Sequence, residues 1–299
     1  MKLLVLGRNG QVGWELERSL APLGDVLALS RADGDLEDIE ALLHLVRRER
    51  PQVLVNATGY TAVDRAEGEP DRADKVNRAA VDTLARWTAT TDALFVHYST
   101  DYVFDGRKAA SYVESDDTAP QSVYGRTKRD GEAAITASGC QHLIFRTSWV
   151  HAARGSNFVR TILRLAKERS ELRIVADQFG APTSAELIAD ITAIAIATFT
   201  RRQAPLPSGI YHLTAGGKTN WYDFARFIVS EATERGARLQ TAVDAVVPIE
   251  ASQYPTAATR PANSMLDTGK LRAALGINLP DWTVHARRSV AELLEGTMA

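Results

Sequence analysis

Five short apolar runs, separated by segments with helical patterning, limit most strongly what this chain can fold into. They are rich in Val, Leu and Ile and read KLLVLG, DVLALS, PQVLVNATG, DALFVHYST and CQHLIFRTSW. Apolar strands that alternate with helices are typical of a parallel sheet with helices on both faces. We therefore expect an α/β fold with a doubly wound parallel sheet, and helices near residues 11–21, 35–49, 72–90 and 122–138.

The strand spacing becomes irregular after Trp149, which predicts a second unit. A helix near 155–169, the strand LRIVA, a helix from about residue 184 and the strand GIYHLT follow there. We expect residues 1–150 to form a dinucleotide-binding domain and residues 151–299 to form mainly a smaller α/β substrate domain. Some elements of the second part are expected to return to the first sheet. The segment RRQAPLPSG reads as a surface loop.

The composition excludes several classes of protein. The 35 basic and 37 acidic residues nearly balance, which argues against broad nucleic-acid binding. A single cysteine, Cys140, leaves no intrachain disulfide and no cysteine-based metal site, so a reducing compartment fits. The apolar N-terminal run is too short for a secretion signal, and the run from Leu187 is too short to span a bilayer. These features predict a cytoplasmic protein with no membrane partner.

Three glycines, Gly7, Gly10 and Gly13, lie between the first predicted strand and the first predicted helix. A tight turn there directs backbone N–H groups and the helix N-terminus at a phosphate, which a Cβ would hold away. Glycine is also common in such turns for local reasons. The strand–turn–helix context favours a dinucleotide site of the Rossmann type.

The end of the second strand indicates which dinucleotide is bound. An acidic side chain at this place favours NAD, because it bonds the 2′-hydroxyl of the adenosine ribose. Here the strand is followed by Ser30 and Arg31, a hydroxyl and a guanidinium that suit the 2′-phosphate of NADPH. Asp35 and Leu36 could cover the adenine. The alternatives are that Arg31 is a solvated loop cation and that Asp35 caps a helix.

Tyr124 and Lys128, in VYGRTK, are four residues apart on a predicted helix and so share one face. A neighbouring ammonium stabilises a phenolate and thereby lowers the pKa of the phenol. Such a phenol can donate a proton to a carbonyl oxygen, while the lysine bonds the nicotinamide ribose. The pattern alone is weak, because most YxxxK occurrences lie on exposed helix faces.

The polar triplet Ser99, Thr100 and Asp101 follows directly on the fourth predicted strand. Ligands of open α/β sheets bind beyond the carboxyl ends of the strands. The Thr100 hydroxyl can there bond the carbonyl that Tyr124 protonates, and a turn that only closes the strand is the alternative. The order of glycine loop, STD and YxxxK along the chain favours a reductase site.

With these motifs on one chain, the sequence resembles the extended short-chain dehydrogenase/reductases and, more closely, the dTDP-4-dehydrorhamnose reductase family. The resemblance covers essentially the whole chain and is carried by GRNGQVGWEL, NATGYTAVDRAE, HYSTDYVFDG, VYGRTK, FRTSWV, DQFGAPT, GIYHL and RPANSMLDTGKL. It implies that NADPH or NADH reduces the C4 ketone of dTDP-4-dehydro-β-L-rhamnose, giving dTDP-L-rhamnose for polysaccharide synthesis.

The resemblance also implies roles for individual residues. Tyr124 would be the proton donor, Lys128 its partner and ribose ligand, and Thr100 the hydroxyl at the carbonyl. Further cofactor contacts would come from Gly10, Gln11, Val12, Gly59, Tyr60, Thr61 and Tyr98. Family members often carry a His in place of Tyr60, so the side-chain contacts of the ribose pocket can differ here.

Substrate contacts are expected from Asp101, Trp149 and Arg260. By resemblance, Asp101 and Trp149 would touch the sugar, although Trp149 could instead pack as a wall of the site. Arg260, in RPANS, could clamp the substrate diphosphate bidentately or form a surface ion pair.

A structural metal and a homodimer are further expectations. Some family members are described as dimers bridged by Mg²⁺ through glutamates, and Glu15, Glu186 and Glu292 occupy matching stretches. A hard cation held by carboxylates is chemically reasonable, with ordinary surface glutamates as the alternative. No HExxH or similar cluster occurs among the six histidines, so no catalytic metal is expected.

Two other functions are compatible with the same motifs. An epimerase or dehydratase on this scaffold would return the hydride to its substrate and keep its nucleotide tightly bound. The regulatory subunit of methionine adenosyltransferase also resembles this family and binds NADP without needing turnover. Fold similarity alone cannot separate these functions from a reductase.

Overall fold

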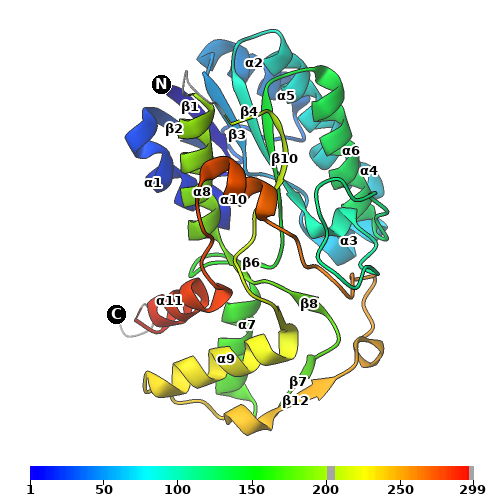
Figure 1. Ribbon diagram of the computed structural model, residues 1–299, viewed down its shortest axis with the longest axis vertical. Coiled ribbons are helices and arrows are strands. Elements are labelled where there is room, and N and C mark those ends of the chain that lie inside the picture. Colours follow the sequence, from blue (N-terminus) through cyan, green and yellow to red (C-terminus); the bar gives the residue numbers. More distant parts are fainter. Residues whose placement is uncertain (201–205, 296–299) are drawn as a thin grey trace.

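The computed structural model describes residues 1–200 and 206–295. Most of the predicted loop RRQAPLPSG, residues 201–205, lies outside the described residues. The described chain has a larger part built on a sheet and a smaller part that packs below it in Figure 1.

The larger part is a six-stranded parallel sheet with the strand order β10-β5-β4-β3-β1-β2. Its strands are β1 Lys2–Leu6, β2 Asp25–Leu29, β3 Val53–Asn56, β4 Leu94–Thr100, β5 His142–Thr147 and β10 Gly209–His212. The chain runs from β1 outward to β2 and then crosses to β3 on the other side of β1. The carboxyl ends of β1 and β3 therefore flank the switch point at which doubly wound sheets bind ligands.

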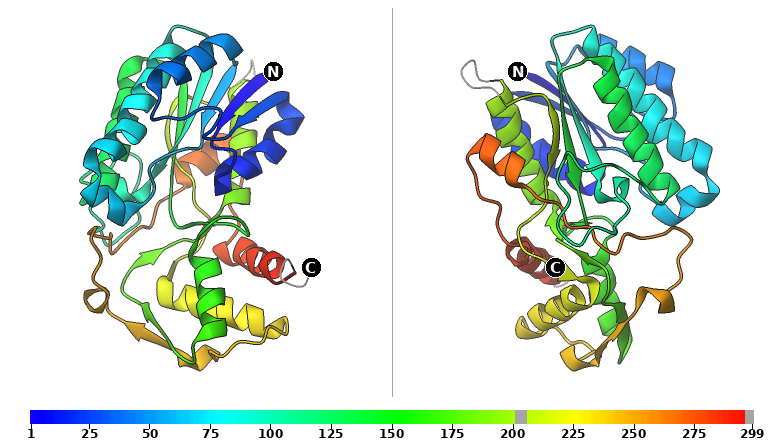
Figure 2. Two further views of the ribbon diagram at one scale, coloured as in Figure 1. Left: turned by 180° about the vertical axis from the view of Figure 1, so that it is seen from behind. Right: turned by 45° about the vertical axis from the view of Figure 1, so that its right-hand side comes forward.

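Helices cover both faces of this sheet, as the two views of Figure 2 show. Alternate residues of β1 enter opposite cores: Leu3 and Val5 join one apolar cluster, and Leu4 and Leu6 join the other. On the first face lie α1 Gln11–Leu20 and α8 Ala185–Phe199, and on the second lie α2 Ile39–Glu49, α5 Ala80–Ala89 and α6 Val123–Ser138. The predicted doubly wound α/β fold is confirmed.

Two predicted helices have different bounds in the structure. The helix expected from residue 35 begins at Ile39, because the Asp38 side chain accepts a hydrogen bond from Ala41 N–H at 3.0 Å and caps the helix there. The helix expected over residues 72–90 is divided into α4 Pro70–Asp74, the π-helical segment η2 Lys75–Ala79 and α5. A preceding short helix, α3 Val63–Gly68, fills the connection from β3.

The smaller part follows β5. It contains α7 Phe158–Glu168, α9 Trp221–Glu234 and α11 Trp282–Glu295, with β7 Leu172–Val175 pairing in parallel with β12 Val246–Ile249. Its remaining elements are β6 Val150–His151, β8 Phe179–Gly180, β9 Thr183–Ser184 and β11 Thr219–Asn220, whereas α10 Gly269–Leu275 packs on β10 and α8 of the larger part. Four short 3₁₀ segments lie in the two parts. η1 Ala21–Leu23 and η3 Asp101–Val103 are in the larger part, and η4 Val243–Ala245 and η5 Ala251–Gln253 are in the smaller part.

The chain returns to the sheet after entering the smaller part. Strand β10 extends the sheet beside β5, and α8 packs against α1. Buried residues of α9 such as Phe224 and Ile228 belong to the same apolar cluster as Leu3 of β1. One continuous core therefore joins the two parts. None of the described helices combines the length and hydropathy of a membrane span.

Candidate functional site

A cleft of about 830 Å³ lies at the carboxyl ends of the central strands, between the two parts of the molecule. This is the size of a typical small-molecule site. It is lined by most of the residues that the sequence predicts: Gly7, Gly10, Gln11, Val12, Arg31, Asp35, Leu36, Gly59, Tyr60, Thr61, Tyr98, Thr100, Asp101, Tyr124, Lys128 and Trp149. Ser30, Arg260, Glu15, Glu186 and Glu292 are not among the lining residues.

The glycine loop has the geometry of a phosphate cradle. Gly7 adopts φ 99°, a left-handed conformation, and its carbonyl accepts from Gly10 N–H at 2.9 Å. A Cβ on Gly13 would overlap the Gly7 carbonyl, so only glycine lets α1 approach the loop this closely. Gly10, at the N-cap of α1, has no side chain to cap the helix. The first N–H groups of α1 thus suit a pyrophosphate, and the site fits a dinucleotide.

Tyr124 and Lys128 lie one turn apart at the start of α6 and reach the cleft together. Ser122 caps this helix by accepting from Gly125 N–H at 3.1 Å, which fixes where the first turn begins. Lys128 is only 4% exposed, and its Nζ donates to the carbonyl oxygen of Tyr98 at 2.5 Å. The predicted YxxxK pair therefore forms part of the cleft rather than an exposed helix face.

Burial dominates the protonation of this pair. It raises the pKa of Tyr124 to about 12, with the Thr100 hydroxyl opposing and the Asp101 charge reinforcing the shift. It lowers the pKa of Lys128 to about 8, against the nearby charge of Glu132. The sequence predicts that Lys128 lowers the Tyr124 pKa, whereas burial raises that pKa in this structure. The phenol is consequently protonated at neutral pH, as a proton donor must be.

Thr100 is oriented by its buried neighbour. Its hydroxyl donates to Asp101 Oδ1 at 3.1 Å and accepts from Tyr102 N–H at 3.2 Å. The other carboxylate oxygen of Asp101 accepts a short hydrogen bond from the Ser264 hydroxyl. Burial raises the pKa of Asp101 to about 6, although both hydroxyl donors oppose that shift. Asp101 thus lines the cleft and also fixes the position of Thr100.

A buried chain of polar groups, which sequence reasoning missed, stands behind Lys128. Asn56 Oδ1 accepts from Thr58 N–H at 3.1 Å, so its amide nitrogen faces His97 Nδ1 at 3.3 Å. That contact places the ring proton on His97 Nε2, which lies 3.0 Å from Lys128 Nζ. Burial and the lysine hold the pKa of His97 well below its usual range. A neutral ring that donates to Nζ favours the unprotonated amine, in the same direction as burial.

The loop after β3 is held by a second buried amide. Asn77 Oδ1 accepts from Tyr60 N–H at 2.8 Å, and its nitrogen donates to Tyr60 O at 3.2 Å and to Thr127 Oγ1 at 3.1 Å. Asn77 lies in η2, and π-helical segments recur at functional sites. The loop carrying Gly59 is thereby fixed against α6, beside Lys128.

Trp149 forms part of the wall of the cleft. Its φ is 51°, which is unusual for a residue with a side chain. The indole stacks on Trp221 with ring centroids 3.5 Å apart, and a Cβ on Gly180 would collide with its other face. The ring is therefore held rigidly while it lines the cleft.

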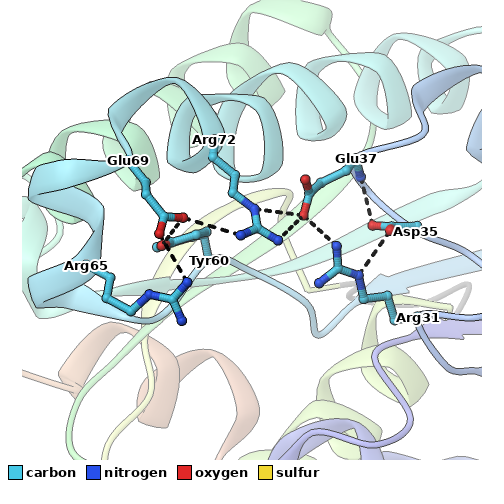
Figure 3. Close-up of polar contacts among 7 residues, drawn as sticks. All are labelled: Arg31, Asp35, Glu37, Tyr60, Arg65, Glu69 and Arg72. Atoms are coloured by element: carbon cyan, nitrogen blue, oxygen red, sulfur yellow. Dashed lines mark hydrogen bonds and ion pairs between the residues drawn. The ribbon is translucent and has the colours of Figure 1, made fainter.

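The end of the cleft beside the loop that follows β2 carries a network of charges (Figure 3). Arg31 donates from Nε to Asp35 at 3.0 Å and from Nη2 to Glu37 at 2.5 Å. Ser30, by contrast, turns its hydroxyl to Asp33 at 2.7 Å and does not line the cleft. Of the two residues predicted at the ribose, only Arg31 lines the cleft.

Arg260 and the three glutamates have arginine or carboxylate partners of their own. Arg260 forms a two-pronged ion pair with Asp64 of α3, at 2.7 and 3.1 Å, instead of facing the cleft. Glu15 pairs with Arg18, and Glu186 and Glu292 both pair with Arg288. Over residues 1–200 and 206–295, no three metal-ligating side chains gather in a group that could hold an ion.

Comparison with known proteins agrees with this geometry. The family model described as RmlD substrate binding domain matches residues 1–295. A dTDP-4-dehydrorhamnose reductase of Burkholderia thailandensis is 52% identical over 98% of this chain and 99% of its own length. The Escherichia coli K12 protein of the same name is 46% identical over 99% of each chain. A crystal structure of the Bacillus anthracis dTDP-4-dehydrorhamnose reductase in complex with NADP superposes with a TM-score of 0.88, at 31% identity over 97% of this chain and 99% of its own. The chain therefore belongs to the dTDP-4-dehydrorhamnose reductase family.

Proposed function

We propose that this protein reduces the C4 ketone of dTDP-4-dehydro-β-L-rhamnose to dTDP-L-rhamnose with NADPH or NADH, and that Tyr124 donates the proton. The observation that carries this proposal is the convergence of Tyr124, Lys128 and Thr100 on the cleft that also contains the glycine loop. Relatives that match this chain over nearly its full length are named for that activity.

The cofactor, bound with its pyrophosphate at Gly10, Gln11 and Val12, would supply the hydride. Tyr124 holds the proton that the ketone oxygen takes up, because burial keeps the phenol protonated in the free protein. Lys128 lies beside Gly59 in the cleft and, with a pKa of about 8, is already the cation that balances the phenolate left after proton transfer at neutral pH. Thr100, whose hydroxyl proton is directed at Asp101, would turn that proton to the same oxygen when the substrate binds.

The wall of the cleft that contains Trp149 is proposed to receive the sugar, and residues 151–299 to supply most of the remaining substrate contacts. We place the protein in the cytoplasm, where nucleotide sugars are made, and propose an isologous homodimer. Sedimentation with and without a chelator tests the dimer and whether Glu15, Glu186 and Glu292 bridge it through Mg²⁺.

The test is loss of absorbance at 340 nm with NADPH and enzymatically prepared dTDP-4-dehydro-L-rhamnose, together with identification of the product by NMR. Rapid oxidation with dTDP-L-rhamnose as product supports the proposal. Stoichiometric nucleotide bound to the purified protein, and no net oxidation, would indicate an epimerase or dehydratase. Tight NADPH binding without turnover of any keto-sugar, and co-purification with a synthetase, would indicate a regulatory subunit.

A further inference from the structure

One carboxylate oxygen at the adenosine end of the cleft is shared by two arginines. Glu37 Oε1 accepts from Arg31 Nη2 at 2.5 Å and from Arg72 Nε and Nη2 at 3.0 and 2.8 Å (Figure 3). All three side chains line the cleft. Arg72 lies on α4, more than forty residues after Arg31 in the sequence. The two arginines therefore meet only in the folded protein.

The position of this cluster relative to the glycine loop identifies its ligand. The carbonyl of Leu29, the last residue of β2, accepts from Gly7 N–H and Arg8 N–H, both at 2.9 Å. The cluster begins two residues further on, at Arg31. In dinucleotide-binding sheets this place meets the 2′ position of the adenosine ribose. The assignment of this ligand rests on the proposed function only in assuming that NADPH or NADH occupies the cleft.

The chemistry of the cluster suits a phosphate better than a hydroxyl. Two guanidinium groups directed at one oxygen form a recognition site for an anion, and Glu37 satisfies it in the free protein. The outer contacts, Arg31 to Asp35 and Arg72 to Glu69, would persist if Glu37 withdrew, so both cations would stay in place. NADH brings no charge to this point, whereas NADPH brings about two negative charges at neutral pH.

We propose that Arg31 and Arg72 together bind the 2′-phosphate of NADPH, and that Glu37, their ligand in the free protein, competes with that phosphate and sets the preference between NADPH and NADH. Arg72 is thus the second phosphate ligand that Ser30 does not supply. Glu37 is a specificity-determining residue that weakens NADPH binding while leaving NADH binding unchanged.

The experiment measures binding by calorimetry, without turnover, for adenosine 2′,5′-bisphosphate and for 5′-ADP, which lacks the 2′-phosphate. Four proteins are compared: wild type, Glu37→Gln, Arg72→Gln and Arg78→Gln. Glutamine at 37 keeps an acceptor for both arginines but removes the charge. Arg78 is the matched control, because its guanidinium donates to Asp74 in the part of the chain that the structure describes, at 2.5 Å, and does not line the cleft.

We expect Glu37→Gln to increase the affinity for adenosine 2′,5′-bisphosphate by about 3- to 10-fold. Arg72→Gln should decrease the same affinity by about 10- to 100-fold. Binding of 5′-ADP should change less than about 2-fold, and Arg78→Gln should change neither ligand. The gain from Glu37→Gln should shrink at about 0.3 M salt, since the competing charges are partly exposed.

Weaker bisphosphate binding in Glu37→Gln would overturn the proposal, since it would show that Glu37 positions the arginines and does not compete. Equal loss of both ligands in Arg72→Gln would also overturn it, because Arg72 would then act on the fold of the cleft. If neither ligand binds the wild type, the assignment of the cleft as the cofactor site is wrong. That outcome differs from one in which both ligands bind and the variants do not change the discrimination between them.

Discussion

The two ends of the cleft differ in how far their charged and polar side chains are exposed to solvent. At the end proposed to bind the ketone, Lys128, Thr100 and Asp101 are between 3% and 5% exposed, and their hydrogen bonds go to buried or half-buried partners. At the adenosine end, Arg31 is 64% exposed and Arg72 39%, and they pair with carboxylates in contact with solvent. Burial strongly shifts the pKa values at the first end, whereas solvent screening weakens each ion pair at the second end. Changes at the first end should therefore alter rate, and changes at the second should alter which cofactor binds.

The largest effect should come from Tyr124→Phe, which removes the proton donor and keeps the ring. We expect kcat to fall by about 10²- to 10⁴-fold, with NADPH affinity within a few-fold of wild type. Single-turnover reduction of the ketone, with cofactor binding measured by fluorescence, checks both values. Retained kcat would mean that another group protonates the substrate.

Thr100→Val should reduce kcat by about 10- to 100-fold, since it removes a hydroxyl at the reacting oxygen without changing the size of the side chain. The same substitution removes a donor to Asp101, so the reaction should be measured with thermal unfolding beside it. Thr192→Val is the control, because Thr192 lies on α8 and does not line the cleft, while its hydroxyl bonds the Tyr98 hydroxyl at 2.8 Å. An equal loss of activity in both variants would assign Thr100 to packing.

A pH profile should reveal the role of His97. Because the pKa of Lys128 is lowered to about 8, the lysine loses its proton as pH rises through that value, and kcat/KM should decline there. His97→Gln presents an acceptor that stabilises the ammonium, so the alkaline limb should move up by about one pH unit. His97→Leu removes the Nε2–H donor without supplying an acceptor, so the limb should move up less than in the Gln variant. A uniform loss of activity with an unmoved limb in the Gln variant would give His97 only a packing role.

The smallest effect should come from Arg260→Gln. Its pair with Asp64 is partly exposed, so we expect a loss of about 0.2–1 kcal/mol in unfolding free energy and an unchanged kcat. Urea denaturation and steady-state kinetics on the dTDP-sugar measure the two quantities. A KM for the sugar that rises by more than about 10-fold would instead assign Arg260 to the substrate diphosphate.

Local pattern was sufficient for the sheet and for the ketone end of the cleft. Apolar runs with helices between them specify a doubly wound sheet, because each strand must be apolar on both faces to be covered twice. Gly7, Thr100 and Tyr124 follow strands or begin helices, and parallel strands bring their carboxyl ends to one edge. Their meeting in one cleft follows from chain order alone, before any side-chain contact is known.

Other features depend on pairs of residues that are far apart in sequence, so only the tertiary structure decided them. The meeting of Arg72 with Glu37 requires α4 to pack beside the end of β2, and nothing local to either residue indicates this. The same holds for Arg260 with Asp64, and for the stacking of Trp149 on Trp221. A sequence specifies which groups are available at each strand end, but long-range packing selects the partner of each charge. That partner decides whether an arginine binds a ligand or joins two segments of the chain.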